Sequence, residues 1–293
     1  MLPVRFWPLL VLLAFAGCGG AAAVDGGDGP RVVATTTQLA DMARNVAPGA
    51  QVVSILKPNT DPHEYEVRPR DVKALAKADI VLRSGGEPDE WLDAALDAAG
   101  VDSADVVNVG ASAGLEGDDP HWWQDPVRAV RAAAVIGRAI PGSMPGPYEA
   151  RLRALDRGVR ACIDRVPVAQ RKLVTSHDAL GYFARRYGIE VVGTVIPARS
   201  TAGQPSAGEV ARLVDTIRSA GVRAIFAESA VNPKVETAIA REAGAHVGRE
   251  LWADTLGPAG SDGASYISSI EANTRSLVAG FTGAPAACEF PGA

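Results

Sequence analysis

Histidine is scarce in this chain, and three of its four histidines stand beside carboxylates. The three sequences are Asp61-Pro62-His63-Glu64, Asp119-Pro120-His121 and Ser176-His177-Asp178. Imidazole is the commonest metal ligand in proteins, and a nearby carboxylate can accept the second ring N–H of a ligating histidine. One such histidine would be an ordinary loop residue, but three in this setting predict a metal site. The candidates for the second contact are Asp61, Glu64, Asp119 and Asp178.

The Asp-Pro-His sequence occurs twice, at His63 and at His121. Proline fixes its own φ and pushes the preceding aspartate toward extended backbone. We therefore expect both imidazoles on rigid turns. Asp125, which precedes Pro126, has the simpler expected role of capping a helix that begins there.

The amino-terminal segment predicts export. Arg5 precedes an apolar run that is too short to span a bilayer, so residues 1–17 are expected to be a signal peptide. This run ends in Phe-Ala-Gly-Cys, which resembles the bacterial lipobox and predicts lipidation at Cys18. An ordinary signal peptide with an incidental cysteine is the alternative. Residues 18–30 are rich in Gly and Ala, and they would form a lipid-anchored tether.

Two cysteines remain if Cys18 carries lipid, namely Cys162 and Cys288. A pair of cysteines in an oxidising compartment more often forms a bridge than stays free, so we predict a Cys162–Cys288 disulfide. Two free thiols are the alternative.

Composition excludes some functions. The formal net charge of -5 argues against a nucleic-acid partner, because phosphate binding needs a positive field. Beyond the amino-terminal run we expect no segment that crosses a membrane. The remaining chain is long enough for two α/β lobes, and we expect a monomer.

Short β-branched runs alternate with helix-period segments, a pattern typical of parallel sheets flanked by helices. The expected strands are residues 31–36, 51–56, 80–84, 106–109, 172–176, 190–195, 224–228 and 246–251.

A proline-rich break at residues 141–147 separates the two halves. A helix with an apolar stripe follows it, from Pro147 to Val166. We expect an N-terminal lobe (31–143), a long connector helix (144–167), a C-terminal lobe (168–283) and a tail (284–293). A crossover helix within one larger sheet is the alternative.

These motifs resemble the zinc and manganese solute-binding lipoproteins of ABC importers, over nearly all of the mature chain. The matching segments are residues 61–66, 68–72, 90–92, 119–123, 174–183 and 253–256. The resemblance implies that His63, His121, His177 and Asp254 are metal ligands in the cleft between the lobes. It also implies an ABC permease and ATPase as partners. His246 lies in no motif and is expected to be structural.

The sequence departs from the family pattern at two places. The His-rich insertion that many zinc-specific members carry before the second ligand is absent. Residues 83–87 (Arg-Ser-Gly-Gly-Glu) lack the usual apolar residues, so the lining of the cleft is expected to differ there.

Three imidazoles and one carboxylate make a tetrahedral site that suits Zn²⁺, with Mn²⁺ as the alternative. With ordinary histidine pKa values, protons should compete with the metal below about pH 6. The predicted function is capture of this ion outside the cytoplasmic membrane and delivery to an ABC importer. The alternatives are a surface adhesin or structural lipoprotein, and a zinc hydrolase.

Overall fold

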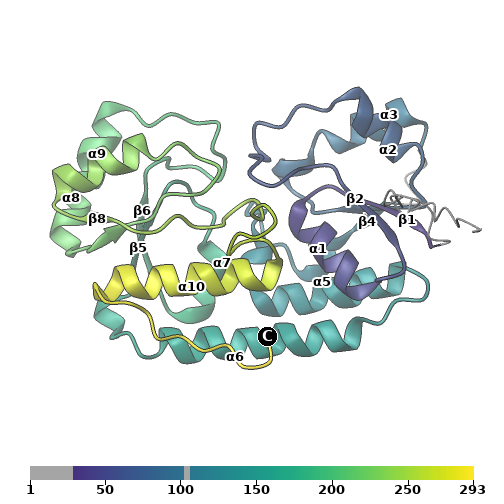
Figure 1. The fold of residues 1–293 in the computed structure, drawn as a ribbon. Helices are drawn as coiled ribbons and strands as arrows, with labels where there is room; N and C mark the ends of the chain where they lie inside the picture. Colours follow the sequence, from purple (N-terminus) through teal and green to yellow (C-terminus); the bar gives the residue numbers. More distant parts are fainter. Residues whose placement is uncertain (1–28, 102–105) are drawn as a thin grey trace, which may run out of the picture.

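The computed structural model describes residues 29–101 and 106–293, so the predicted signal peptide, Cys18 and most of the tether lie outside the described residues. Two α/β halves stand side by side in Figure 1, and a long helix runs beneath both. The expected class, parallel sheets flanked by helices, is confirmed. In the described ranges no helix is long and apolar enough to cross a bilayer.

The first half contains a four-stranded parallel sheet in the order β2-β1-β3-β4. Its strands are β1 (Arg31–Ala34), β2 (Gln51–Ser54), β3 (Ile80–Arg83) and β4 (Val106–Asn108). The β-branched residues of the central strand β1 are buried, and Val33 pairs with Val53 on one side and with Val81 on the other. Because the strands are parallel, their carboxyl ends share one edge, and loops leave the sheet together there.

The second half pairs its strands two by two, all in parallel. They are β5 (Lys172–Thr175), β6 (Glu190–Thr194), β7 (Ala224–Ile225) and β8 (His246–Val247). An isolated parallel bridge between Thr175 and Phe226 links the two pairs. Every strand begins at the predicted residue and ends sooner than predicted, because the following residues turn away into loops.

Ten α-helices and three 3₁₀-helices are present in the described residues. The α-helices are α1 (Thr37–Val46), α2 (Pro69–Leu75), α3 (Leu92–Ala99), α4 (Val109–Ala113), α5 (Pro126–Ala139), α6 (Pro145–Ile163), α7 (Gly181–Tyr187), α8 (Ala207–Ala220), α9 (Lys234–Ala243) and α10 (Tyr266–Thr282). The 3₁₀-helices are η1 (Glu87–Asp89), η3 (Trp122–Gln124) and η4 (Val168–Gln170). Asp125 caps α5 as predicted, since its side chain accepts a hydrogen bond from the Val127 N–H.

Helix α6 connects the two halves (Figure 1). The predicted start at Pro147 is wrong, because the helix already begins at Pro145, another proline that suits a first helical turn. Its predicted apolar stripe is buried, and it belongs to a core cluster that also includes residues of α1, α5 and α10. Helix α6 therefore packs against both halves through one shared hydrophobic core.

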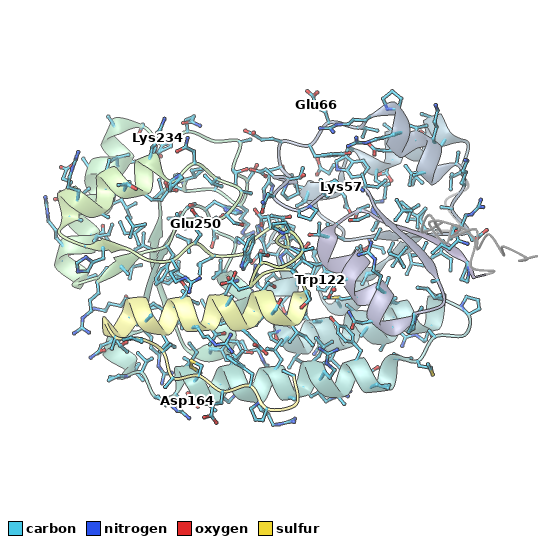
Figure 2. All side chains as sticks on the ribbon, in the orientation of Figure 1. Lys57, Glu66, Trp122, Asp164, Lys234 and Glu250 are labelled. Carbon is cyan, nitrogen blue, oxygen red and sulfur yellow. A yellow bond between two sulfur atoms is a disulfide. The ribbon has the colours of Figure 1, made fainter. Side chains whose placement is uncertain are left out.

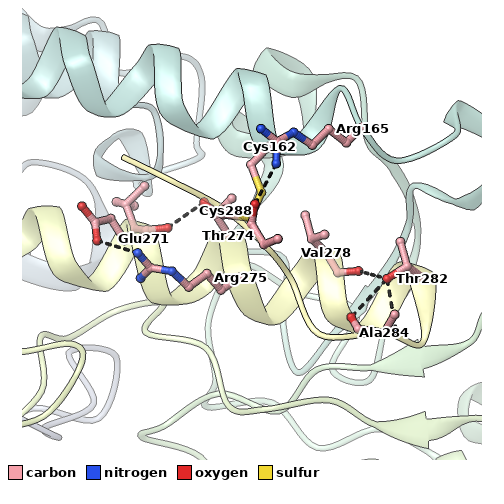
Figure 3. The surroundings of a disulfide bond; sticks show 11 residues. Cys162, Arg165, Glu271, Thr274, Arg275, Val278, Thr282, Ala284 and Cys288 are labelled. Carbon is pink, nitrogen blue, oxygen red and sulfur yellow. Dashed lines mark hydrogen bonds and ion pairs between the residues drawn. A yellow bond between two sulfur atoms is a disulfide. The ribbon is translucent and has the colours of Figure 1, made fainter. Parts of the chain in front are cut away.

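The predicted cysteine pair, Cys162 of α6 and Cys288 of the tail, is joined by a disulfide with a Cα–Cα distance of 5.3 Å. Figure 3 shows the tail lying along α6, where Arg165 donates a hydrogen bond of 2.7 Å to the Ala287 carbonyl. The bridge therefore fixes the tail to the connecting helix.

Candidate metal site

The four predicted ligands come from both halves. His63 lies in the loop between β2 and α2, and His121 directly precedes η3. His177 follows β5, and Asp254 lies between β8 and α10. The structure brings all four together, since each offers one ligand atom and these atoms lie within 4.8 Å of one another. Within the described part of the chain, this is the one group of three or more His, Cys, Asp or Glu side chains that could hold a metal ion.

Carboxylates hold the backbone of each histidine. Asp61 Oδ1 accepts a hydrogen bond of 3.0 Å from the His63 N–H, and Asp119 Oδ1 accepts one of 3.1 Å from the His121 N–H. Both turns are the expected Asp-Pro-His turns. The His177 N–H donates to Glu228 Oε1 at 3.1 Å.

Carboxylates also contact the Nδ1 atom of each ring, at 2.5 Å for His63, 3.0 Å for His121 and 2.6 Å for His177. The partners are Glu87, Asp119 and Glu228, respectively. An ionised carboxylate can only accept, so Nδ1 carries the proton and Nε2 is left for a metal.

Of the four candidate carboxylates, only Asp119 contacts its histidine ring. Asp61 holds the backbone of His63 instead, and Asp178 lies 3.6 Å from Arg199. Glu64 is exposed at a small cavity beside the site. Proximity in sequence did not identify the carboxylates that contact the rings of His63 and His177, because tertiary folding brings Glu87 and Glu228 to these rings.

The two missed carboxylates each had a signal in the sequence. Glu87 closes the segment 83–87, where the chain departs from the family pattern. Glu228 was the last residue of an expected strand, so the shared carboxyl edge of a parallel sheet would have placed it near His177.

Several of the ligand atoms lie at separations that suit a small metal ion. Asp254 Oδ2 lies 3.5 Å from His63 Nε2 and 3.3 Å from His177 Nε2, and Asp254 Oδ1 lies 3.4 Å from His121 Nε2. The Nε2 atoms of His121 and His177 are also 3.3 Å apart. A tetrahedral Zn²⁺ with bonds of 2.0–2.1 Å needs ligands about 3.3–3.4 Å apart. These four separations of 3.3–3.5 Å lie close to that requirement.

The side chains of the four candidate ligands are almost fully buried. The three imidazoles have no exposed side-chain surface, and the Asp254 side chain is 4% exposed. His63 Nε2 and Asp254 Oδ1 are buried without a hydrogen-bond partner. Buried polar atoms normally have partners, so these two suggest that an ion belongs between them.

Protonation balances the charges in the metal-free site. Burial alone would lower the pKa of His177, but the carboxylates of Glu228 and Asp254 outweigh it and raise that pKa to about 10. The pKa of His63 is also raised, because Asp254 and Glu87 outweigh its burial. For Asp254, burial would raise the pKa, but the three histidines hold it well below its usual range.

His246 lies outside the site. It begins the exposed strand β8 and lines a separate open groove of the second half. The structure therefore gives His246 no part in the four-residue cluster.

Fold and site together define an α/β protein whose two halves enclose three histidines and one aspartate suited to a transition-metal ion. The family profile described as "Zinc-uptake complex component A periplasmic" matches residues 32–280. The chain therefore belongs to the ZnuA family. It is a metal-binding component of an ABC importer that works outside the cytoplasmic membrane, and it is not an enzyme.

Individual relatives support this assignment. The chain is 32% identical to "Zinc-binding protein TroA" of Treponema pallidum, over 88% of this chain and 90% of the relative. It is also 32% identical to "Manganese-binding lipoprotein MntA" of Bacillus subtilis, over 88% and 92%. A solved structure of the periplasmic zinc-binding protein TroA superimposes with a TM-score of 0.78 at 28% identity, covering 86% of this chain and 99% of that one.

Proposed function

We propose that this protein captures one Zn²⁺ ion through the Nε2 atoms of His63, His121 and His177 and a carboxylate oxygen of Asp254. The observation that carries the proposal is the close approach of these buried atoms, with separations of 3.3–3.5 Å between Asp254 oxygens and the three Nε2 atoms and between two of the Nε2 atoms. Two ligands come from each half, so the bound ion would hold the halves together.

Ligand chemistry favours Zn²⁺ over Mn²⁺. Manganese prefers harder oxygen ligands and higher coordination numbers, whereas three imidazoles and one carboxylate suit four-coordinate zinc. The names of relatives do not decide the metal, because they include manganese, iron and zinc. Four protein ligands leave no open position for a reacting water, which also argues against a hydrolase.

We also propose how the chain is organised and how it is anchored to the membrane. Residues 31–143 and 168–283 would form the two lobes, and residues 144–167 the connector. Lipid on Cys18 would anchor a monomer to the membrane through the tether, close to the permease. Several relatives are named as lipoproteins, which supports the anchor.

Competitive loading tests the metal. The protein is stripped with a chelator, exposed to equal Zn²⁺ and Mn²⁺, desalted and analysed for both metals. We expect one zinc per chain and little manganese. Retention of manganese would overturn the proposed metal, and loss of both ions would overturn the site.

Growth in chelated medium tests delivery. A strain that lacks this protein should stop growing at a chelator concentration that the parent tolerates, and added zinc should restore growth. Unchanged growth of the deletion strain would count against delivery to an importer.

A further inference from the structure

A loop of the second half crosses to the first half directly beside the site. Residues 197–203, called the strap below, lie between β6 and α8. Three successive strap residues contact carboxylates of the first half: Arg199 contacts Asp118, Ser200 contacts Glu87, and Thr201 contacts Asp61.

Two of these carboxylates are the ones that hold His63. Thr201 Oγ1 donates a hydrogen bond of 2.6 Å to Asp61 Oδ2, while Asp61 Oδ1 accepts from the His63 N–H. Ser200 Oγ donates to Glu87 Oε1 at 3.4 Å, while Glu87 Oε2 contacts the His63 ring. Each carboxylate thus uses one oxygen for the strap and the other for His63.

Other contacts between the two halves are buried. The indole of Trp123 and the amide of Gln124 both donate to the Ala253 carbonyl, and the Tyr266 hydroxyl donates to the Trp123 carbonyl. All of these hydrogen bonds are buried, and Figure 2 shows neighbouring Trp122 where the halves meet.

Solvent reaches the strap side more easily. The Asp118 side chain is 92% exposed and that of Glu87 is 44% exposed. Exposed polar contacts contribute little to stability, so the contacts of Arg199 with Asp118 and of Ser200 with Glu87 break at lower cost than the buried ones. The contact of Thr201 with Asp61 is part-buried and is the strongest of the three. Because the four ligand side chains are almost fully buried, an ion can leave only after some contact opens.

We infer that Ser200 and Thr201 are positioning residues that hold His63 on the metal through Glu87 and Asp61, so that opening of the strap sets the rate of metal release. The inference rests on the proposed ligand set. When the strap detaches, Asp61 and Glu87 both lose the hydrogen bonds that position them against His63. His121 and His177 keep their own carboxylates, Asp119 and Glu228, which do not contact Ser200 or Thr201.

Release kinetics test this inference. Zn²⁺-loaded protein is mixed with a large excess of a chromogenic chelator, and the dissociation rate is followed. Thr201→Val keeps the shape of the side chain and removes the hydroxyl, so we expect release to become about tenfold faster or more. Thr201→Ser restores the hydroxyl and should release zinc near the wild-type rate. Ser200→Ala, which removes a longer and more exposed contact, should have a smaller effect.

The matched control is Thr216→Val on α8, where an exposed hydroxyl donates to the Arg212 carbonyl of its own helix. It should leave release unchanged. Visible absorption of the Co²⁺-loaded forms should be the same in wild type and Thr201→Val, because the ligands stay the same.

The outcomes of these experiments distinguish a failure of the strap inference from a failure of the proposed ligand set. Unchanged release from Thr201→Val, with one ion still bound, would overturn the role of the strap and leave the ligand set standing. Equal acceleration by Thr216→Val would overturn it too. Failure of the wild-type protein to bind an ion at this site would overturn the proposed function together with the inference.

Discussion

Zinc affinity should rise with pH well above the range in which an ordinary histidine titrates. His177 has its pKa raised to about 10 in the metal-free protein, so its ring is protonated at pH 6.5–8.5 and must lose a proton to bind zinc. One proton released per ion makes affinity rise about tenfold per pH unit. Between pH 6.5 and 8.5 we therefore expect at least a hundredfold increase, or about 2.7 kcal/mol of binding free energy. The raised pKa of His63 adds to this trend.

The assay is zinc competition against a chelator of known proton affinity at pH 6.5, 7.5 and 8.5. Calorimetry in two buffers of different ionisation enthalpy counts the released protons independently. An affinity that stays constant above pH 7, with no proton released at pH 8, would refute the reasoning. The expectation from sequence, that protons compete only below about pH 6, is corrected by the buried carboxylates around His177.

Glu228→Gln separates this mechanism from general electrostatics. Removal of the charge should lower the pKa of His177, so that affinity depends less on pH above 7.5. Glu250→Gln is the control, because Glu250 is exposed on the second half (Figure 2). If both variants kept the wild-type pH dependence, Glu228 would not be the cause.

Three further predictions concern stability. Zinc at a thousandfold excess over its dissociation constant should stabilise the protein by about 4 kcal/mol, and calorimetric melting should show that His177→Ala loses most of this gain while His246→Ala keeps it; the reverse pattern would refute the ligand assignment. The Cys162–Cys288 bridge closes a sequence separation of 126 residues, so the Cys162→Ser/Cys288→Ser variant should lose about 3 to 5 kcal/mol in denaturant unfolding, and thiol titration of the unreduced wild type should find neither cysteine free. Because the pKa of His177 is raised, its contribution to the metal-free protein is present below about pH 6.5 and is lost as pH rises through about 10; metal-free melting temperatures that increase steadily from pH 7 to 10 would contradict this.

The strands and the apolar stripe of α6 could be predicted because they depend on local patterns. β-branched residues such as Val32 and Val33 are buried in the sheet, and the stripe that includes Leu152 and Val159 belongs to the shared core. Strand ends were less predictable, because loop contacts decide where pairing stops. The start of α6 was uncertain for a similar reason, since several prolines nearby suit a first helical turn.

Local sequence predicted the histidines of the candidate site but not two of the carboxylates that contact them. His63, His121 and His177 stand in recognisable motifs, but Glu87 and Glu228 lie 24 and 51 residues from the histidines that they contact. Such pairs depend on tertiary structure, which neighbouring sequence does not encode. The contact of Thr201 with Asp61 crosses 140 residues and had no signal at all.

Anomalous diffraction at the zinc edge tests the central claim most directly. Crystals of the zinc-loaded protein should show a single strong peak, about 2.0–2.2 Å from Nε2 of His63, His121 and His177 and from one carboxylate oxygen of Asp254. A peak at any other place, or a zinc ion held by Nδ1 atoms or by fewer than these four residues, would contradict the account.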